Sequence, residues 1–528
     1  MTDRTFATDV VIVGAGSAGC VLANRLSADP ALRVILIEAG NEATDPRIAD
    51  PSAWPLLQGT GVDWALATTP QRGLAGRAHA WPRGRVIGGS SAIHAMGHMR
   101  GHPGDFDAWA AAGATGWTWD ALRPFFVRSE SSPFAGDEGY GDDGPMPLCQ
   151  PATPHPLTRC HIAAGVEVGL TPIRDHNGPA MAGPTLNTMT IKGGRRVSVA
   201  DAYLTTAVRA RGNLQVLTGV VVDRVVIGPD GRATGVLGRA DTGNLAVNGH
   251  LAVILAAGSI GSPCILMRSG IGPGRALAAL GIAVLRDSPG VGANLQDHLL
   301  CAGHVYRSRR PVPRTTTQHS ESLTYIAAPG ADPGAPPGLV VGVVTVPVLS
   351  DGLAGLADAP GPGQGYTLMF GNTHPHSRGR LWLRSADPAV PPMIDPQYLA
   401  ADEDRTQMLQ ALDWARRIGN ARAFDGWRGE AVFPRPQDLA SDVTRLGFIE
   451  RAATSHHHPV GTCRMGTDGM AVVRPDLSVP GVAGLYIVDG SILPGLTTGP
   501  VNAAIIAVAE RAATLLTAGF ATGAERQV

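Results

Sequence analysis

The feature that most constrains the fold of this chain is a glycine pattern between a short strand and a helix near its N-terminus. The β-branched run 10–13 leads into Gly14, Gly16 and Gly19, spaced as G-x-G-x-x-G, and an apolar helix is predicted directly after them. A second predicted strand then ends at Glu38. This order predicts a β-α-β unit of a parallel sheet at the start of the chain.

Each glycine has a distinct use in such a unit. Gly14 permits the tight turn from strand to helix, Gly16 lets the backbone approach a pyrophosphate, and Gly19 lets helix and strand pack closely. The helix N-terminus stabilises phosphate charge, and Glu38 can accept hydrogen bonds from ribose hydroxyls. The alternative is a chance glycine-rich turn, which the flanking strand, helix and acid disfavour. The motif alone does not separate FAD from NAD.

Composition sets the broad class of protein. The 528 residues suit two domains that share a large core, which 44% hydrophobic residues can fill. A formal net charge of -1 implies no basic face, so nucleic acid and anionic membranes are not expected partners. No uninterrupted apolar run is long enough for a spanning helix, and the polar residues 1–9 do not suggest a signal peptide. We therefore expect a cytoplasmic protein.

The rest of the chain alternates predicted elements with glycine- and proline-rich segments. Strands are predicted within residues 214–260, and helices at Trp119–Phe126, Arg405–Asn420 and Val501–Leu516. The six cysteines are scattered without a C-x-x-C pair, so neither a zinc site nor a disulfide framework is expected.

Five further segments carry glycine, histidine or acidic residues in patterns that suit a ligand site. In Gly84–His94, two adjacent glycines and two serines suit backbone held close to a flat or anionic ligand, and a flexible surface loop is an equal alternative. The others are Gly258–Gly272, Gly290–His298, His456–Gly466, and Tyr486–Ser491 followed by Thr498–Asn502.

In order and spacing, these six segments resemble those of the glucose-methanol-choline (GMC) oxidoreductase family. The resemblance runs from Thr8 to about Leu516 and includes linking segments such as Asp105–Trp109 and Ser377–Leu383. It implies FAD as the cofactor, a flavin that accepts hydride, and alcohol substrates. It also implies an α/β fold with a Rossmann-like FAD-binding domain and a second, substrate-binding domain built on an antiparallel sheet.

The resemblance implies a discontinuous arrangement of the two domains. Residues 1–155, 196–300 and 452–528 are expected to form the FAD-binding domain, and residues 156–195 and 301–451 the substrate-binding domain. The active site is expected where the two domains meet, because ligand sites occur preferentially at such junctions.

Residues that match the family's cofactor-binding segments can be carried over one by one. The resemblance assigns the adenosine end to the first glycine motif with Glu38, and to the backbone of Val222. It assigns the pyrophosphate and flavin to the loop at Gly88 and to the strand end at Asp489. The full set expected to bind the cofactor is Gly14, Gly16, Ser17, Ala18, Gly19, Glu38, Gly88, Gly89, Ser90, His94, Val222, Asp489, Gly490, Pro500 and Val501.

Some family members attach the flavin covalently to a histidine in the double-glycine loop. Here that position falls on Ile93, and His94 stands one residue later, where most members carry Asn. We therefore expect non-covalent FAD. His94 is expected near the flavin, and a hydrogen-bonded, half-buried structural histidine is an equal alternative.

His458 matches the family's active-site histidine, the residue before Pro-Val-Gly-Thr. An alcohol carbon gives up hydride easily only if the hydroxyl proton leaves with it or earlier, and a neutral imidazole suits that proton transfer. Once protonated, the imidazolium stabilises a nearby anion. His458 is therefore the expected catalytic base.

Three consecutive histidines also raise the possibility of a metal site. Adjacent residues on an extended segment point to alternate faces, so His456, His457 and His458 cannot all converge on one ion. No metal is expected, and His456 and His457 are predicted to be structural.

The family usually places a second polar residue, His or Asn, opposite the active-site histidine. In this chain the position falls on Pro500, which has no side-chain donor and no backbone N–H. Pro500 is still assigned to the catalytic centre, and Asn502, two positions along, is the alternative polar partner. A proline here resembles family members that act on pyridoxine, so a primary alcohol on a flat aromatic ring is the expected substrate.

The resulting hypothesis is an FAD-dependent alcohol oxidase that forms an aldehyde and reduces oxygen to hydrogen peroxide. A dehydrogenase of the choline-dehydrogenase type, with a non-oxygen electron acceptor, is the first alternative. A flavin-dependent lyase and a non-catalytic flavin-binding protein are the others, and the intact His458 motif disfavours the last.

Overall fold

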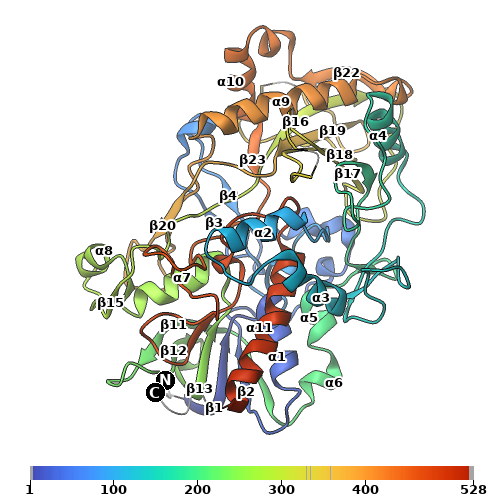
Figure 1. Cartoon of the computed structure of the whole chain (residues 1–528). Coiled ribbons are helices and arrows are strands. Elements are labelled where there is room, and N and C mark those ends of the chain that lie inside the picture. Colours follow the sequence, from blue (N-terminus) through green and yellow to red (C-terminus); the bar gives the residue numbers. More distant parts are fainter. Residues whose placement is uncertain (1–3, 329, 333, 357, 523–528) are drawn as a thin grey trace.

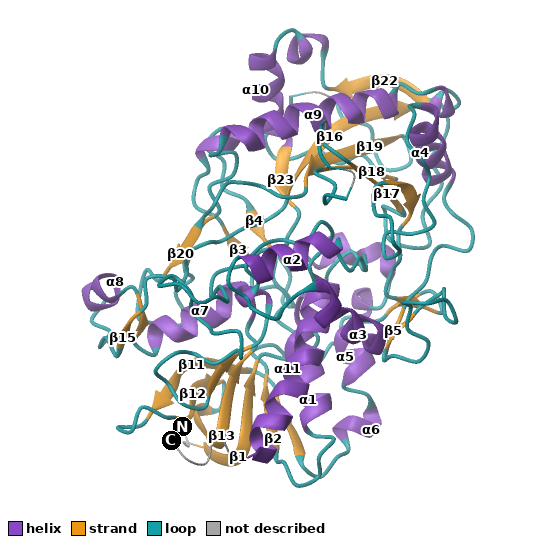
Figure 2. Cartoon of the chain, in the orientation of Figure 1, coloured by secondary structure: helices purple, strands orange, loops and turns teal. Residues whose placement is uncertain are grey.

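The computed structural model describes residues 4–328, 330–332, 334–356 and 358–522. Its strands form two large sheets, one at each end of the molecule, joined by long irregular segments (Figure 1). Helices lie against both sheets (Figure 2). The architecture confirms the predicted α/β class, with one mostly parallel sheet and one antiparallel sheet.

The first sheet contains the predicted β-α-β unit. Its strand order is β10-β2-β1-β13-β12-β11, and β24 pairs with β13. Neighbours from β10 to β13 run parallel, as does β24, whereas β11, β12 and β13 are antiparallel. The central strands end in apolar, buried runs, residues 10–13 of β1, Val34–Ile37 of β2 and residues 252–255 of β13, as in a sheet covered on both faces. The bounds are β1 (Arg4–Val13), β2 (Val34–Ile37), β10 (Leu214–Leu217), β11 (Val220–Ile227), β12 (Ala233–Ala240), β13 (Gly243–Leu255) and β24 (Leu485–Ile487).

Two helices that lie far apart in the sequence pack together beside this sheet. They are α1 (Ser17–Leu26), near the N-terminus, and α11 (Asn502–Thr522), near the C-terminus. Glu510 of α11 is fully buried and accepts from Arg25 of α1 at 2.7 Å. This ion pair links a helix near the start of the sequence to a helix near its end.

Residues Asn502–Ala521 of α11 are long and apolar enough to cross a membrane by length and hydropathy. Glu510 and Arg511 interrupt this apolar run, so the sequence alone does not predict a spanning helix here. In this structure 56% of the segment is buried, and the buried ion pair of Glu510 is typical of a core helix.

The second sheet has the order β22-β16-β19-β18-β17-β7, with β23 pairing β16, and every pairing is antiparallel. Helices α4 (Pro156–Glu167) and α9 (Asp402–Gly419) pack on it. The bounds are β7 (Gly183–Leu186), β16 (Leu299–Ser308), β17 (Ser322–Ile326), β18 (Leu339–Val344), β19 (Gly365–Asn372), β22 (Arg428–Phe433) and β23 (Ala453–Ser455).

The predicted domain bounds and the sheets differ at two places. Strand β16 begins at Leu299, and β23 occupies 453–455, so both extend segments predicted for the FAD-binding domain into the second sheet. Residues 1–3 and 523–528, also predicted for that domain, lie outside the described residues. The division into domains otherwise stays a prediction.

The remaining elements are short and lie mainly between the sheets or at their edges. The helices are α2 (Pro103–Ala111), α3 (Trp119–Ser129), α5 (Val199–Tyr203), α6 (Thr206–Arg209), α7 (Gly258–Arg268), α8 (Gly274–Ala279) and α10 (Asp442–Ala452). The strands are β3 (Leu66–Ala67), β4 (Ala80–Trp81), β5 (Glu130–Ser131), β6 (Met146–Pro147), β8 (Ile191–Lys192), β9 (Arg195–Arg196), β14 (Ile271–Gly272), β15 (Arg286–Asp287), β20 (Arg380–Trp382) and β21 (Met393–Asp395).

Candidate active site

The turn from β1 to α1 is built so tightly that only glycine fits at two positions. Gly14 has φ +103°, and a Cβ there would lie 2.5 Å from the carbonyl oxygen of Ala256. A Cβ on Gly19 would lie 1.8 Å from the carbonyl oxygen of Gly14. These approaches explain the first and third glycines of the motif by contact with protein backbone.

The second predicted glycine loop lies against the first. The N–H of Gly88 donates to the carbonyl of Ala15 at 2.8 Å. A Cβ on Gly89 would lie 2.7 Å from the Cα of Gly16, so the two backbones face each other without side chains between them. Ser90, the next residue, accepts from the N–H of Gly84 at 3.2 Å.

Glu38 lies at the carboxyl end of β2, with its carboxylate turned back toward this turn. Its Oε2 accepts from the N–H of Ala15 and its Oε1 from the N–H of Gly40, both at 2.8 Å. Burial is the largest influence on this group and raises its pKa. The backbone of Glu38 also pairs with Val220, which places buried Val222 of β11 nearby in the same sheet.

Asp489 and Gly490 follow β24 at the same end of the first sheet. The carboxylate of Asp489 is 3% exposed and accepts from the N–H of Gly258 at 2.9 Å and of Ser491 at 2.7 Å. Burial raises its pKa. A Cβ on Gly490 would lie 3.0 Å from Ser259 Oγ, so this strand end also approaches α7 closely.

The starts of α1 and α11 meet at this same edge. Ser17 Oγ donates to Asn502 Oδ1 at 2.6 Å, and Ala18 and Val501 beside them are buried. Asn502 Nδ2 is buried without a hydrogen-bond partner among the described residues. A free amide donor, two facing glycine loops and a helix N-terminus together fit a phosphate-bearing cofactor.

His94 follows the short 3₁₀ turn Gly89–Ala92, and its environment keeps it neutral. Burial lowers its pKa to about 3. Its Nδ1 accepts from the N–H of Met96 at 3.0 Å, and its Nε2 is buried with no partner in the described part of the chain. Ile93, the position of covalent attachment in some relatives, packs in a small apolar cluster with Ile48 and Val86.

His458 is held by its backbone at the end of β23. Its N–H donates to Asp297 Oδ1 at 2.6 Å. The preceding residue, His457, has φ +66°, and its carbonyl accepts from Arg83 at 2.7 Å. Tyr398 and Ser455 donate to the other oxygen of Asp297, while burial raises the pKa of this carboxyl to about 6.

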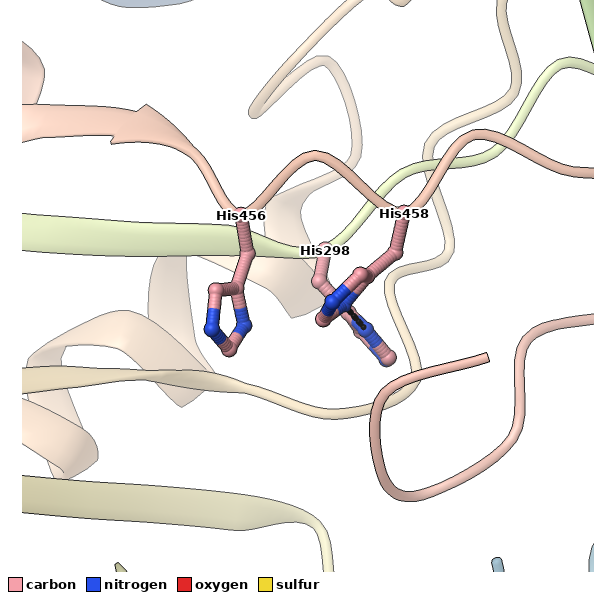
Figure 3. Close-up of side chains that lie close together, drawn as sticks. All are labelled: His298, His456 and His458. Carbon is pink, nitrogen blue, oxygen red and sulfur yellow. Dashed lines mark hydrogen bonds between the residues drawn. The ribbon is translucent and has the colours of Figure 1, made fainter. Parts of the chain in front are cut away.

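Three histidine rings converge at this point, which we call the histidine cluster: His298, His456 and His458 (Figure 3). The antiparallel pairing of β16 and β23 brings them together, because His456 N–H donates to the carbonyl of His298 at 2.9 Å. The ring centroids of His456 and His458 are 4.3 Å apart. His298 Nδ1 lies 2.9 Å from His458 Nδ1.

All three rings of the histidine cluster are neutral near pH 7. Burial is the largest cause in each case, followed by the neighbouring imidazoles. It lowers the pKa of His298 and of His456 to about 3, and that of His458 well below its usual 6.5. A neutral imidazole is the form that accepts a proton.

Pro500 lines a small cavity beside two rings of this cluster, His298 and His456. The cavity wall combines apolar side chains of the second sheet with polar groups at its edge, and comprises His298, Leu300, Tyr325, Val340, Asn372, Thr373, His456, Thr498, Gly499 and Pro500. A larger surface hollow of about 430 Å³, lined by residues such as Asp50 and Arg314, shares none of these residues. The smaller cavity is therefore the candidate substrate site.

The structure corrects the interpretation of His456 as purely structural. As predicted, side chains alternate between the two faces of this segment: His456 and His458 share one face and lie close together. His456 lines the cavity together with Pro500. His298 was not assigned a role from the sequence, although it ends the noted segment Gly290–His298. Only the pairing of β16 with β23 reveals its position.

The histidine cluster also has the spacing of a metal-ligand group, with one nitrogen of each ring within 4.8 Å of the others. Two rings already bond to each other through their Nδ1 atoms, and His298 Nε2 lies 2.7 Å from the carbonyl of Thr373. A metal ion would have to break the bond between His298 and His458. The hydrogen-bonded arrangement favours proton chemistry at this site.

Residues 8–300 match the N-terminal part and residues 375–509 the C-terminal part of the GMC oxidoreductase family. The chain belongs to this family and is an FAD-dependent oxidoreductase acting on the CH–OH group of alcohols. The glycine loops, Asp489 and Asn502 fit that cofactor, since they offer close backbone approach and a free donor.

Individual relatives are similar over nearly their whole length. The chain is 45% identical to pyridoxine 4-oxidase of Microbacterium luteolum, over 97% of this chain and 99% of that one. The crystal structure of pyridoxine 4-oxidase from Mesorbium loti superimposes with a TM-score of 0.92 at 45% identity, covering 97% and 99%. Identity to an oxygen-dependent choline dehydrogenase of Photobacterium profundum is 36%, covering 96% and 92%.

Proposed function

We propose that this protein is an alcohol oxidase that converts a primary alcohol on a flat aromatic ring to the aldehyde, with pyridoxine as the substrate and pyridoxal as the product. The observation that carries the proposal is the cavity in which two neutral histidines, His298 and His456, share the wall with Pro500 and apolar side chains of the second sheet. The similarity to pyridoxine 4-oxidases supports the choice of alcohol.

The residues at the cavity have different roles, and His458 lies beside it, 2.9 Å from the lining residue His298. His458 accepts the hydroxyl proton of the alcohol, and its low pKa keeps it in the accepting form. His456 holds the same hydroxyl from the side, which replaces the polar partner that relatives offer at the position of Pro500. Tyr325 and Pro500 line the cavity and offer apolar rings against which an aromatic substrate would pack.

FAD, when bound, supplies the two-electron acceptor for this oxidation and passes the electrons to oxygen, which becomes hydrogen peroxide. We propose that FAD is bound without a covalent link, because Ile93 stands at the attachment position and has no nucleophilic atom. Acid precipitation of the protein tests this point, since non-covalent FAD stays in the supernatant.

A panel of pyridoxine, benzyl alcohol, choline and ethanol tests the proposal. We expect pyridoxine to give the highest kcat/KM with one peroxide per aldehyde. Anaerobic flavin bleaching by an alcohol without peroxide in air would instead identify a dehydrogenase with another acceptor, a reaction type that the 36% identity to a choline dehydrogenase supports. No bleaching by any alcohol would leave a lyase or a non-catalytic flavoprotein.

A further inference from the structure

A chain of three polar groups runs from the second sheet to His458. The carbonyl of Thr373, at the end of β19, lies 2.7 Å from His298 Nε2, and His298 Nδ1 lies 2.9 Å from His458 Nδ1. His298 and Thr373 are 4% and 1% exposed, so their hydrogen bond is shielded from solvent.

The direction of the hydrogen bonds in this chain follows from its fixed end. A backbone carbonyl only accepts, so Nε2 of His298 carries the hydrogen that faces Thr373. A neutral imidazole carries one hydrogen, which leaves His298 Nδ1 as an acceptor. The hydrogen between the two rings therefore belongs to Nδ1 of His458, and Nε2 of His458 carries none.

We infer that His298 is a positioning residue that fixes the tautomer and ring orientation of His458, so that the basic Nε2 is presented to the substrate hydroxyl. The inference rests on the proposed function, in which His458 is the base. His298 also lines the cavity, but its Nδ1 is engaged with His458 and its Nε2 with Thr373, so we infer that it acts through His458.

The same arrangement suits His458 after it has taken the proton. The new hydrogen resides on Nε2, and the Nδ1–H of the imidazolium keeps donating to His298, now as a stronger, charge-assisted bond. No ring has to turn during the reaction. The charged and titratable groups near His298 are His458, His456, His374 and Asp105, and burial is the largest influence that keeps His298 neutral.

Two substitutions of His298 separate the acceptor from the ring. In His298→Asn the amide oxygen replaces Nδ1 as the acceptor for His458, whereas His298→Leu keeps the volume and removes the acceptor. We expect the leucine variant to lower the anaerobic rate of flavin reduction by pyridoxine at least about tenfold, and the asparagine variant to recover most of it. His304→Leu is the matched control, because His304 is an equally buried histidine of β16 that does not line the cavity.

A double substitution distinguishes positioning from structural damage. In the His458→Ala background, His298→Leu should cost almost nothing further, because the group on which it acts is gone. A full additional loss there, or equal losses in the asparagine and leucine variants, would overturn the inference.

A readout that does not depend on turnover is the ¹⁵N spectrum of the histidine rings, assigned by difference from His458→Ala. We expect His458 to appear as the Nδ1–H tautomer in the wild-type protein and to populate the Nε2–H tautomer in His298→Leu. An unchanged tautomer would overturn the inference. Loss of activity on EDTA treatment with recovery on zinc addition would also overturn it, since a metal-bound Nδ1 carries no hydrogen.

The failure of this inference is distinguishable from failure of the proposed function. If no alcohol reduces the flavin of the wild-type protein, the proposed function fails. If pyridoxine reduces it, and His458→Ala is slow while His298→Leu is normal, only the role of His298 fails.

Discussion

The two halves of the active centre are encoded in different ways. The edge of the first sheet, which we call the glycine edge, consists of residues 14–19 and 88–90, and its shape comes from backbone atoms in direct contact. The histidine cluster consists of side chains from two distant segments, brought together when β16 pairs with β23. The glycine edge is therefore defined by the positions that lack a side chain. The histidine cluster is defined by the rings that come into contact.

This difference predicts different responses to change. A side chain added at the glycine edge meets backbone that cannot move without loss of the sheet. A side chain removed from the histidine cluster leaves the backbone intact and removes a function. The following experiments test this contrast, from the largest expected effect to the smallest.

We expect Gly19→Ala to abolish folding or FAD loading. Its Cβ would lie 1.8 Å from the carbonyl oxygen of Gly14, so α1 would have to move off β1. Expression yield, circular dichroism and the ratio of flavin to protein absorbance measure the outcome. Gly61→Ala is the control, since a Cβ there has no heavy atom within 4 Å. A yellow, folded Gly19→Ala protein would show that the glycine edge tolerates repacking.

Acid should unfold this protein at a higher pH than it unfolds most globular domains of this size. Six histidines have their pKa lowered to about 3 by burial, so they are neutral when folded and take up protons when unfolded: His94, His161, His298, His304, His456 and His457. The unfolded state then binds more protons between pH 6.5 and 3, and stability falls as the pH drops through that window, by up to about 1.4 kcal/mol per pH unit for each group.

Three buried acids, Glu38, Asp297 and Asp489, have raised pKa values and act in the opposite direction, but they are fewer. We expect Tm to be level above pH 7 and to decline steeply below pH 6. His304→Leu should flatten the decline by one proton, although it lowers the starting Tm. A Tm that is constant between pH 7 and 5 would contradict the neutral state of these rings.

We expect His458→Ala to retain FAD and to lose about a hundred- to ten-thousandfold in the anaerobic rate of flavin reduction. The acid limb of that rate in the wild-type protein should lie well below pH 6.5, because burial lowers the pKa of His458. Stopped-flow absorbance measures both. His457→Asn is the control, since asparagine tolerates the left-handed backbone at this position. Near-normal reduction in His458→Ala would remove this residue from the mechanism.

The same contrast explains what the sequence alone could predict. The β-α-β unit was recognised because strand, glycines, helix and Glu38 are contiguous, and each has a local steric or electrostatic reason. Helices predicted at Arg405–Asn420 and Val501–Leu516 correspond to α9 and α11, since apolar periodicity is also local.

The histidine cluster was predicted only in part. The family resemblance identified His458, but local alternation could not show that His456 shares its face with a residue 158 positions earlier in the chain, His298. That meeting depends on the register of β16 against β23, a long-range pairing with no local signal. Buried Glu510 likewise interrupts an apolar helix for a reason that only its partner Arg25 explains.

At the glycine edge, we expect Glu38→Ala to weaken FAD binding by about ten- to a hundredfold, the usual value of hydrogen bonds to a charged group. Relative kcat/KM values across the alcohol panel should not change, because Glu38 does not line the substrate cavity. Fluorescence of FAD released during dilution measures the affinity. Glu38→Gln, which keeps one acceptor oxygen for Ala15 or Gly40, should fall between wild type and alanine. Unchanged FAD retention in Glu38→Ala would refute the assignment.

The smallest effect on turnover is expected for Asn502→Ala, which tests where one region ends and the other begins. Asn502 stands two residues after Pro500 and is the natural alternative partner for the substrate hydroxyl. In the structure its Oδ1 accepts from Ser17 Oγ at 2.6 Å, and Asn502 is not among the residues that line the cavity. Asn502 therefore contacts the glycine edge, through Ser17. We expect saturating turnover with pyridoxine to change less than about twofold, while FAD affinity falls several-fold, as after loss of a single hydrogen bond.

Ser17→Ala should reproduce this affinity loss, and the double variant should add little, because the two side chains share one bond. A large fall in flavin reduction with normal FAD content would instead make Asn502 the partner of the hydroxyl, and His456 would lose that role.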